Sequence, residues 1–548
     1  MPRNKSIFSL LFLLLVLLTF VAWQYDGYLF ADGDEVSAKK QNVQKINEVL
    51  GYVQNYYVDD VDWNKSMNGA IKGMLETLDP HSVYFTAEEA RQNEENFQGR
   101  YEGIGIHYDV IDGYLTVISV IPGSPSEDAG LMAGDRIIMI DDVSSYGINS
   151  TEVPSKLKGP KGTPVKVTVT REGFDEPIEF TLIRDEIPIF TVNTYFMADK
   201  ITGYIWLNRF ASTTADEVET ALINLEKQGM KRLLLDLRGN GGGYLRQAVE
   251  IVGKFIDGHN LVVYTKGKLP KYDEEYFSDD FGRSIKRDYP LVILIDHGSA
   301  SASEIVAGAI QDYDRGLIVG TNSFGKGLVQ NEFVLNDDSK LRLTVSKYYT
   351  PSGRLIQRPY KDKNIGEYYN DLNYDDDRLD STKSVTEDSV RERPVYSTKG
   401  GRSVFGGGGI TPDTIVVYKS YSKSLKMTQK FLQKRIFFEV ATHFANHNTQ
   451  WKDRFTDFLN SFEVDPDLLL SLRTAAEKKN IKFANDEFDR DEEFLKSRLK
   501  AEIARTYWGM SSYWQVFSQY DNQFQIALNL FPESIKLAQL GHIHQNQK

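Results

Sequence analysis

A serine and a lysine 25 residues apart could together perform nucleophilic catalysis in this sequence of 548 residues. Ser301 lies in DHGSASASEIVAGAIQDY, directly after the apolar run LVILID, and Lys326 follows the apolar run GLIVG. Such runs, separated by helical patterns, are typical of strands in an α/β sheet, whose carboxyl ends gather ligands. A serine attacks when a base removes its proton, and lysine can be that base when burial lowers its pKa. The two residues therefore predict a site at one edge of a sheet.

Lys326 also fits part of the phosphate-binding pattern G-x-x-x-x-G-K-[ST]. Gly320, Gly325 and Lys326 have the required spacing, but Gly327 stands where the pattern needs a hydroxyl. The following LVQNEFVL has the pattern of a strand, whereas a phosphate loop opens a helix. The sequence therefore favours another role for Lys326.

Two further features near the pair have structural as well as chemical interpretations. Ser301-Ala-Ser-Glu304 matches a helix-capping box. Capping and catalysis are compatible, because a helix N-terminus favours developing negative charge. His297, four residues before Ser301, could supply a base, although a residue just past a strand is more often structural.

The elements that would position these residues follow from hydrophobic periodicity. Residues 36–98 show helical spacing, and residues 99–186 alternate apolar and polar residues between turn signals. Residues 187–418 alternate strands with helices, around a polar stretch at 358–404 that predicts an insertion, and residues 419–548 are mostly helical. We expect a multidomain α/β protein with a β-rich domain and a helical C-terminal region.

The residues at the N-terminus predict that the body of the chain is exported. Residues 6–25 form an uncharged apolar run that, as a helix, would span a bilayer. Arg3 and Lys5 precede the run and acidic residues follow it, which predicts an exported body that faces the periplasm from the inner membrane. We favour a retained signal anchor over a cleaved signal peptide at residues 1–30, because no A-x-A sequence follows.

The amino-acid composition restricts the classes of ligand and partner that the protein could bind. The net charge is −13, with 64 Lys and Arg against 77 Asp and Glu, which argues against nucleic acid as a partner. Cysteine is absent, which excludes thiolate metal sites and a cysteine nucleophile. His443 and His447 have a spacing that can bind zinc on a helix, but no third ligand is evident from the sequence. We therefore expect no metal and no cofactor.

Several motifs resemble those of the carboxyl-terminal processing peptidases, also called tail-specific proteases. The resemblance rests on GSASASEIVAGAIQDYDRGLIVGTNSFGKGLVQ, KLRLTVSKYYTPSGRLIQ, LDPHSVYF (residues 78–85), LLLDLRGNGGG (residues 233–243) and GITPD (residues 409–413). It implies a Clp- or crotonase-like α/β peptidase core with a PDZ domain. It also implies that Ser301 is the nucleophile, that Lys326 is the general base and that Gln330 orients this lysine.

The resemblance further implies an oxyanion hole formed by the N–H groups of Gly242 and Ala302. The family usually has a proline where this sequence has Gly241, so the choice among residues 241–243 stays open. Asp312 matches an acidic family position near the dyad, but a solvated carboxylate at a helix end is equally compatible with the sequence.

The motif YEGIGIHY corresponds to a PDZ carboxylate loop. The N–H groups of Gly103, Ile104, Gly105 and Ile106 would hold the carboxylate of a peptide that adds as a strand, and the two isoleucines would line an apolar pocket.

Together these features predict an exported serine endopeptidase that cleaves proteins near their C-termini. Its substrates would be selected by their free apolar tails. The alternative is a PDZ-bearing scaffold that has lost peptidase activity. The sequence decides neither the physiological substrate nor the oligomeric state, and an oligomer is possible.

Overall fold

The computed structural model describes residues 33–545, except 283–284, 286, 362, 364, 370–392 and 420–421. Two compact units are present, Met1–Met74 and Leu75–Lys548. The apolar run at residues 6–25, where we expect an anchor, lies outside the described residues. Within the described ranges, every helix is too short or too polar to cross a membrane.

The described part of the first unit is helical. It contains α2 (Gly33–Tyr56) and most of α3 (Trp63–Glu76). Val43, Ile46 and Val49, which share one face of α2, are each more than half exposed. The apolar spacing in the sequence therefore marks a helix whose apolar face is not buried within its own unit.

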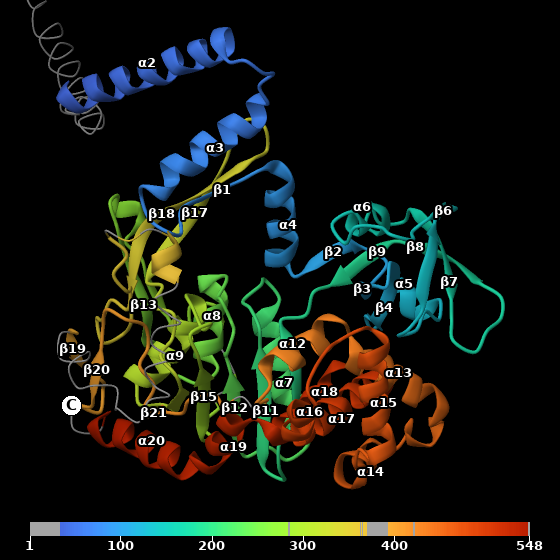
Figure 1. Cartoon of the computed structure of the whole chain (residues 1–548). Helices are drawn as coiled ribbons and strands as arrows, with labels where there is room; N and C mark the ends of the chain where they lie inside the picture. The colour runs from blue at the N-terminus through green and yellow to red at the C-terminus, as the bar shows by residue number, and fades with distance from the viewer. Residues whose placement is uncertain are drawn as a thin grey trace, which may run out of the picture. The chain divides into compact units, whose positions relative to one another are not determined.

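A six-stranded sheet forms the centre of the second unit (Figure 1). Its order is β10 (Val192–Met197), β11 (Thr202–Leu207), β12 (Arg232–Asp236), β15 (Leu291–Ile295), β16 (Leu317–Gly320) and β21 (Thr414–Ile415). The pair β10–β11 is antiparallel and the other pairs are parallel. The parallel strands bring the residues that follow β15 and β16 to the same edge of the sheet.

Both faces of this sheet are covered by helices. Leu233 and Leu235 pack in one core with α7 (Thr214–Lys227), α8 (Leu245–Gly253) and α9 (Ala302–Asp312). Leu234, between them, packs on the opposite face with residues of α19 (Asn522–Asn529) and α20 (Phe531–Gln545). Strand residues point alternately to the two faces, so an uninterrupted apolar strand is buried on both sides.

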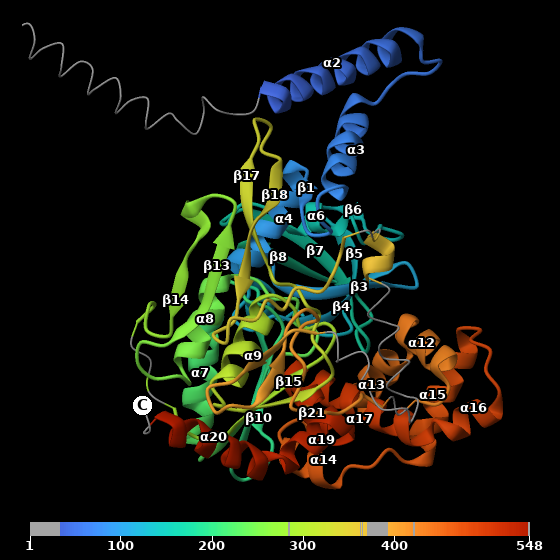
Figure 2. The same ribbon diagram turned by 90° about the vertical axis from the view of Figure 1, so that its left-hand side faces the viewer.

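A second sheet lies beside Lys326. The strand β18 (Lys340–Tyr349) pairs with β1 (Val83–Phe85), β13 (Leu261–Gly267) and β17 (Leu328–Val334), and β13 pairs with β14 (Glu275–Phe277). The β17–β18 ribbon is seen side-on in Figure 2. Because β17 begins two residues after Lys326, a strand stands where a phosphate loop would need a helix.

The PDZ domain has its own apolar core. Its sheet has the order β3 (Ile106–Ile111), β4 (Tyr114–Val120), β5 (Arg136–Ile140), β7 (Pro164–Thr170) and β8 (Ile178–Ile183), and β6 (Val143–Ser144) pairs with β5. The short helices α5 (Pro125–Asp128) and α6 (Val153–Leu157) accompany it, and β2 (Arg100–Gly103) pairs with β9 (Asp185–Pro188) where the chain enters and leaves. The strand β3 is an edge strand of the described sheet.

The remaining elements complete the second unit. A separate apolar core holds α12 (Leu425–Gln433), α13 (Ile436–His447), α14 (Phe455–Ser461), α15 (Pro466–Lys478), α16 (Asn485–Arg490), α17 (Glu492–Trp508) and α18 (Met510–Phe517). The helix α4 (Ala87–Gln98) leads into the PDZ domain. The expected insertion at 358–404 is not only loop, because β19 (Val395–Ser397) pairs there with β20 (Ser403–Phe405) and Tyr368 is buried.

Candidate active site

Ser301 lies at the turn between β15 and α9. Its backbone has a φ of +55°, a left-handed conformation that residues with a side chain rarely adopt. Strain of this kind recurs where a strand-to-helix turn presents a nucleophile. The Ser301 N–H donates to the Glu304 carboxylate at 2.9 Å, as the capping box predicted from the sequence requires.

Lys326 lies in the loop between β16 and β17 and lines the same cavity as Ser301. The cavity has a volume of about 940 Å³. Its wall also includes Gln330, the three glycines 241–243 and Tyr348. The structure thus brings together the serine, the lysine, the glutamine and the glycine loop that the sequence assigns to one site.

Glu304 connects the backbones of the serine and the lysine. Its Oε2 accepts hydrogen bonds from the N–H groups of Ser301 and Lys326, both at 2.9 Å. Its Oε1 accepts from the N–H of Gly325 at 2.7 Å and from the Ser323 hydroxyl. The side chain is fully buried, and burial raises the pKa of its carboxyl to about 7. The sequence shows Glu304 only as a capping residue, because the second loop that it holds is distant in the chain.

The surroundings of Lys326 favour a neutral amine. Burial lowers the pKa of Lys326 to about 8, and the positive charge of Arg342 acts in the same direction. The carboxylates of Glu304 and Asp79 oppose this shift. A lysine with this pKa is partly unprotonated near neutral pH, which is the form that can accept a proton.

The motif LDPHSVYF borders the lysine from another element. The Asp79 carboxylate accepts hydrogen bonds from the N–H groups of His81 and Ser82 and from the Thr344 hydroxyl. Thr344 Oγ1 lies 3.5 Å from Gln330 Nε2, which ties the motif to the glutamine on β17. The motif therefore fixes the strand pair that positions Gln330.

His81 lies close enough to Lys326 for the two charges to interact. Burial lowers the pKa of His81 to about 3, and the Lys326 charge contributes to the shift. Its Nε2 lies 3.1 Å from the Tyr368 hydroxyl. His81 is therefore neutral at physiological pH and does not add a positive charge next to the lysine.

The glycine loop contacts the serine closely. A methyl group added to Gly242 would lie 2.8 Å from Ser301 Cβ and 2.9 Å from Ala302 N, and its φ is +94°. The Gly242 N–H donates to Asn240 Oδ1 at 2.9 Å. The loop thus lies where an oxyanion hole requires it, but in this conformation the predicted Gly242 donor is occupied by Asn240.

Two residues considered from the sequence lie elsewhere. His297 lines a different cavity, together with Arg238 and Asp521, and is not among the residues that line the Ser301 cavity. Asp312 is buried and pairs with Arg354 at 2.7 Å, so of the two alternatives left open by the sequence the solvated carboxylate is wrong. Its place at the C-terminal end of α9 gives it a structural partner that the sequence does not reveal.

The predicted carboxylate loop joins β2 to the edge strand β3. Gly105 has a φ of +82°, and its carbonyl oxygen accepts hydrogen bonds from Ile121 N–H at 2.9 Å and from the Ser124 hydroxyl at 3.1 Å. Ile104 and Ile106 are buried in the PDZ core. The loop is therefore held by hydrogen bonds at the start of β3, which is an edge strand within the described residues, an arrangement compatible with peptide addition.

A serine on a strained strand-to-helix turn, in an α/β core that carries a PDZ domain, defines a serine-type peptidase. Sequence comparison agrees with this class: Peptidase family S41 matches residues 201–365 and a PDZ domain matches residues 116–171. The N-terminal domain of the activating protease CtpB matches residues 26–89, and a family of unknown function matches residues 427–509. The chain belongs to peptidase family S41, among the carboxy-terminal processing proteases, which confirms the resemblance seen in its motifs.

Two named relatives, at 37% and 36% identity, support this membership. A carboxy-terminal-processing protease of Bartonella bacilliformis is 37% identical over 328 residues, which are 59% of this chain and 74% of the relative. Carboxy-terminal processing protease CtpB of Bacillus subtilis is 36% identical over 328 residues, 59% of this chain and 67% of the relative. Among solved structures, the photosystem II D1 C-terminal processing protease matches with 26% identity and a TM-score of 0.34, over 68% of this chain and 86% of that one.

Proposed function

We propose that this chain is a serine endopeptidase with a Ser301–Lys326 dyad and that it cleaves exported proteins near their C-termini. The observation that supports the dyad most strongly is Glu304, which binds the backbone N–H groups of both residues while they line one cavity. A carboxylate shared in this way fixes the nucleophile and the base relative to each other, which is the positioning that catalysis needs.

In the proposed reaction, neutral Lys326 takes the proton from the Ser301 hydroxyl as its oxygen attacks the scissile carbonyl. The resulting lysine ammonium then gives a proton to the leaving amine, and water hydrolyses the acyl-enzyme with the same lysine as base. Gln330 orients the lysine. The N–H of Ala302 and one from the glycine loop stabilise the tetrahedral oxyanion.

The PDZ domain selects the substrate by its tail. The loop from Gly103 to Ile106 binds the free carboxylate, and the tail adds as a strand along β3, whose other edge pairs with β4. An apolar last residue is preferred, because the loop is bordered by the apolar PDZ core. Substrates are thus proteins or peptides with free apolar C-termini.

The location is proposed from the sequence. Residues 6–25 anchor the chain in the inner membrane, and the body faces the periplasm because basic residues precede the run and acidic residues follow it. Protease added to intact spheroplasts should degrade the body, and complete protection would contradict this orientation.

Mass spectrometry of peptides incubated with the protein tests the catalytic proposal. We expect cleavage by the wild type, none by Ser301→Ala and none by Lys326→Arg, because arginine does not give up its proton. Lys347→Arg, at an exposed position on the neighbouring β18, is the matched control and should keep its activity. A folded Lys326→Arg protein with near-normal turnover would exclude Lys326 as the base, and an inactive wild type that binds peptides would favour the scaffold alternative.

The same assay tests the role of the PDZ domain. Each peptide is supplied with a free and with an amidated C-terminus, and we expect slower cleavage of the amide because it lacks the charge that the loop binds. Equal rates would exclude carboxylate recognition without affecting the dyad.

A further inference from the structure

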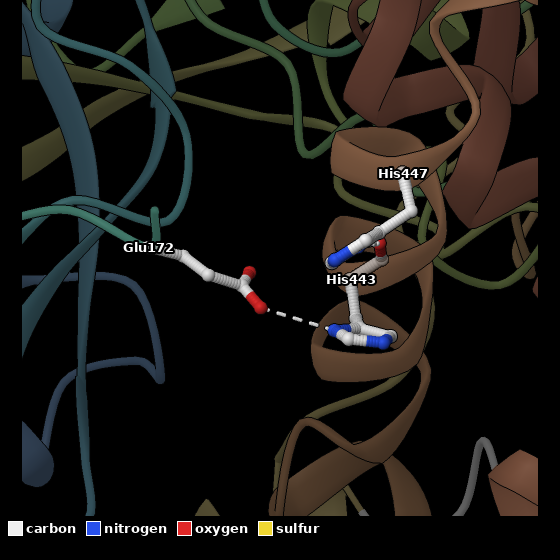
Figure 3. Close-up of side chains that lie close together, drawn as sticks. All are labelled: Glu172, His443 and His447. Atoms are coloured by element: carbon white, nitrogen blue, oxygen red, sulfur yellow. Dashed lines mark hydrogen bonds and ion pairs between the residues drawn. The ribbon is translucent and has the colours of Figure 1, made fainter. Parts of the chain in front are cut away.

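The PDZ domain and the helical region meet at a cluster of three side chains that could bind a metal. Glu172 lies in the turn between β7 and β8 of the PDZ domain, and His443 and His447 lie one helical turn apart on α13 (Figure 3). One ligand atom from each residue lies within 4.8 Å of those of the other two. The sequence reveals the histidine pair but not the glutamate, because Glu172 is 271 residues from His443.

Hydrogen bonds orient these side chains towards one another. Glu172 Oε1 lies 3.0 Å from His443 Nδ1, and Glu172 Oε2 accepts from Asn446 Nδ2 at 2.9 Å. His447 Nδ1 lies 2.8 Å from the carbonyl oxygen of His443. A histidine that binds a metal through one nitrogen commonly donates from the other to a carbonyl, so this contact leaves His447 Nε2 as the ligand atom.

The cluster is accessible, and two nearby cations are paired with carboxylates. The side chains of His443 and Glu172 are 67% and 49% exposed, so an ion can enter without a change of fold. Arg171, next to Glu172, is paired with Asp135 at 2.6 Å, and Arg435 at the start of α13 is paired with Asp109 at 2.6 Å. These pairs limit the repulsion that a divalent cation would meet.

We propose that Glu172, His443 and His447 bind one divalent transition-metal ion, with zinc as the best match, and that this ion fastens the PDZ domain to the helical region. Two imidazoles and a carboxylate form a ligand set that zinc uses with water in the fourth position, and two histidines four residues apart on a helix can share one ion. Imidazole ligands disfavour magnesium and calcium, which prefer oxygen.

The ion would strengthen a contact that also includes two ion pairs. Lys479 pairs with Asp112 at 3.1 Å, and Arg435 with Asp109 at 2.6 Å. Ion pairs near the surface contribute little to stability, whereas a ligand that binds only the docked arrangement stabilises it increasingly as its concentration rises above Kd. Zinc would thus determine how firmly the PDZ domain is held against the helical region. This also gives a role to the segment that matches a family of unknown function.

Titration calorimetry with zinc chloride on the full chain, freed of any tag and of bound metal, tests the site. We expect one zinc per chain. Glu172→Gln and His447→Ala should weaken binding by about 100-fold or more, since even outer partners of a metal site cost up to this much. The matched controls are Glu176→Gln, an exposed glutamate in the same turn, and His259→Gln, an exposed histidine elsewhere, and both should bind like the wild type. Magnesium should not compete.

Hydrogen exchange tests whether the ion holds the PDZ domain to the helical region. Zinc should slow exchange in the β7–β8 turn and in α13 together, and it should slow neither in the His447→Ala protein. The three residues are exposed, so circular dichroism should show that the variants are folded. The site is excluded if the wild type binds zinc no better than His443→Ala. A zinc link between the PDZ domain and the helical region is excluded if zinc slows exchange in only one of the two elements.

Discussion

Lys326 depends on its neighbours for the protonation state that the proposed chemistry needs. Burial and the Arg342 charge lower the pKa of Lys326 to about 8. The adjacent His81, with a pKa of about 3, stays neutral over the same range. Glu304 is the other group beside the dyad whose pKa, about 7, lies within the working range.

The rate of peptide cleavage should therefore rise with pH to a plateau above about pH 8. Because the active lysine is the unprotonated form, kcat/KM should fall with decreasing pH and approach about a tenfold loss per pH unit once the pH is more than about one unit below its pKa. Below about pH 7 the fall should steepen, because protonated Glu304 loses acceptor capacity for its four donors. Initial rates on a peptide without ionisable groups near the cut measure the profile, and a rate independent of pH between 6 and 8 would contradict it.

Glu304→Gln should separate the two ionisations. The amide NH₂ of glutamine would face either the N–H groups of Ser301 and Lys326 or the N–H of Gly325 and the hydroxyl of Ser323. We expect kcat to fall by about 100-fold from misplacement of the dyad. Stability should fall by about 1–3 kcal/mol from buried donors that lose their acceptor. The residual activity should lack the steep limb below pH 7, and a variant with normal kcat would show that Glu304 does not position the dyad.

At the scale of elements, local patterns in the sequence predict the strands and helices around the site well. The apolar runs around Ser301 and Lys326 become β15, β16 and β17, and the helix after Ser301 becomes α9. The contacts between elements are not in these patterns. Glu304 appears in the sequence as a cap although it also holds the Lys326 loop, and the sequence leaves open whether Asp312 is solvated although it pairs with buried Arg354.

The PDZ domain offers a matched pair of glycines, one in the carboxylate loop and one outside it, for testing whether the loop must be held in place. Gly105 and Gly123 have φ values of +82° and +73°. A methyl group on Gly105 would lie 2.1 Å from Ser124 Cβ, whereas one on Gly123 meets nothing within 4 Å. Both alanine variants share the backbone strain, about 1–2 kcal/mol, but only Gly105→Ala adds a collision.

Gly105→Ala should therefore lower PDZ stability more than Gly123→Ala and should also remove the preference for a free C-terminus. Urea unfolding and the ratio of cleavage rates for free and amidated peptides are the two measurements. Equal effects of the two substitutions on both would show that the contact with Ser124 does not shape the loop.

At the scale of the molecule, the end of the chain completes the peptidase core. The helices α19 and α20 cover one face of the central sheet, on which Leu234, Val292 and Leu294 pack with Phe524 and Phe531. The sequence predicts a helical C-terminal region but not this return, because an apolar helix face does not say which sheet it will cover. The uninterrupted apolar residues of β12 and β15 show that both faces of the sheet must be covered, and only the structure shows which helices cover them.

Phe531→Ala should consequently destabilise the peptidase core although it lies 230 residues after Ser301 in the sequence. Phe531 is 1% exposed, and truncating a buried phenylalanine costs about 3–5 kcal/mol. Ile535→Ala, on the same helix but 44% exposed, is the control and should change stability by less than about 0.5 kcal/mol. The measurement is the urea midpoint for loss of peptidase activity together with hydrogen exchange in β15. If Phe531→Ala left both unchanged, α20 would not be part of the core that holds the active site.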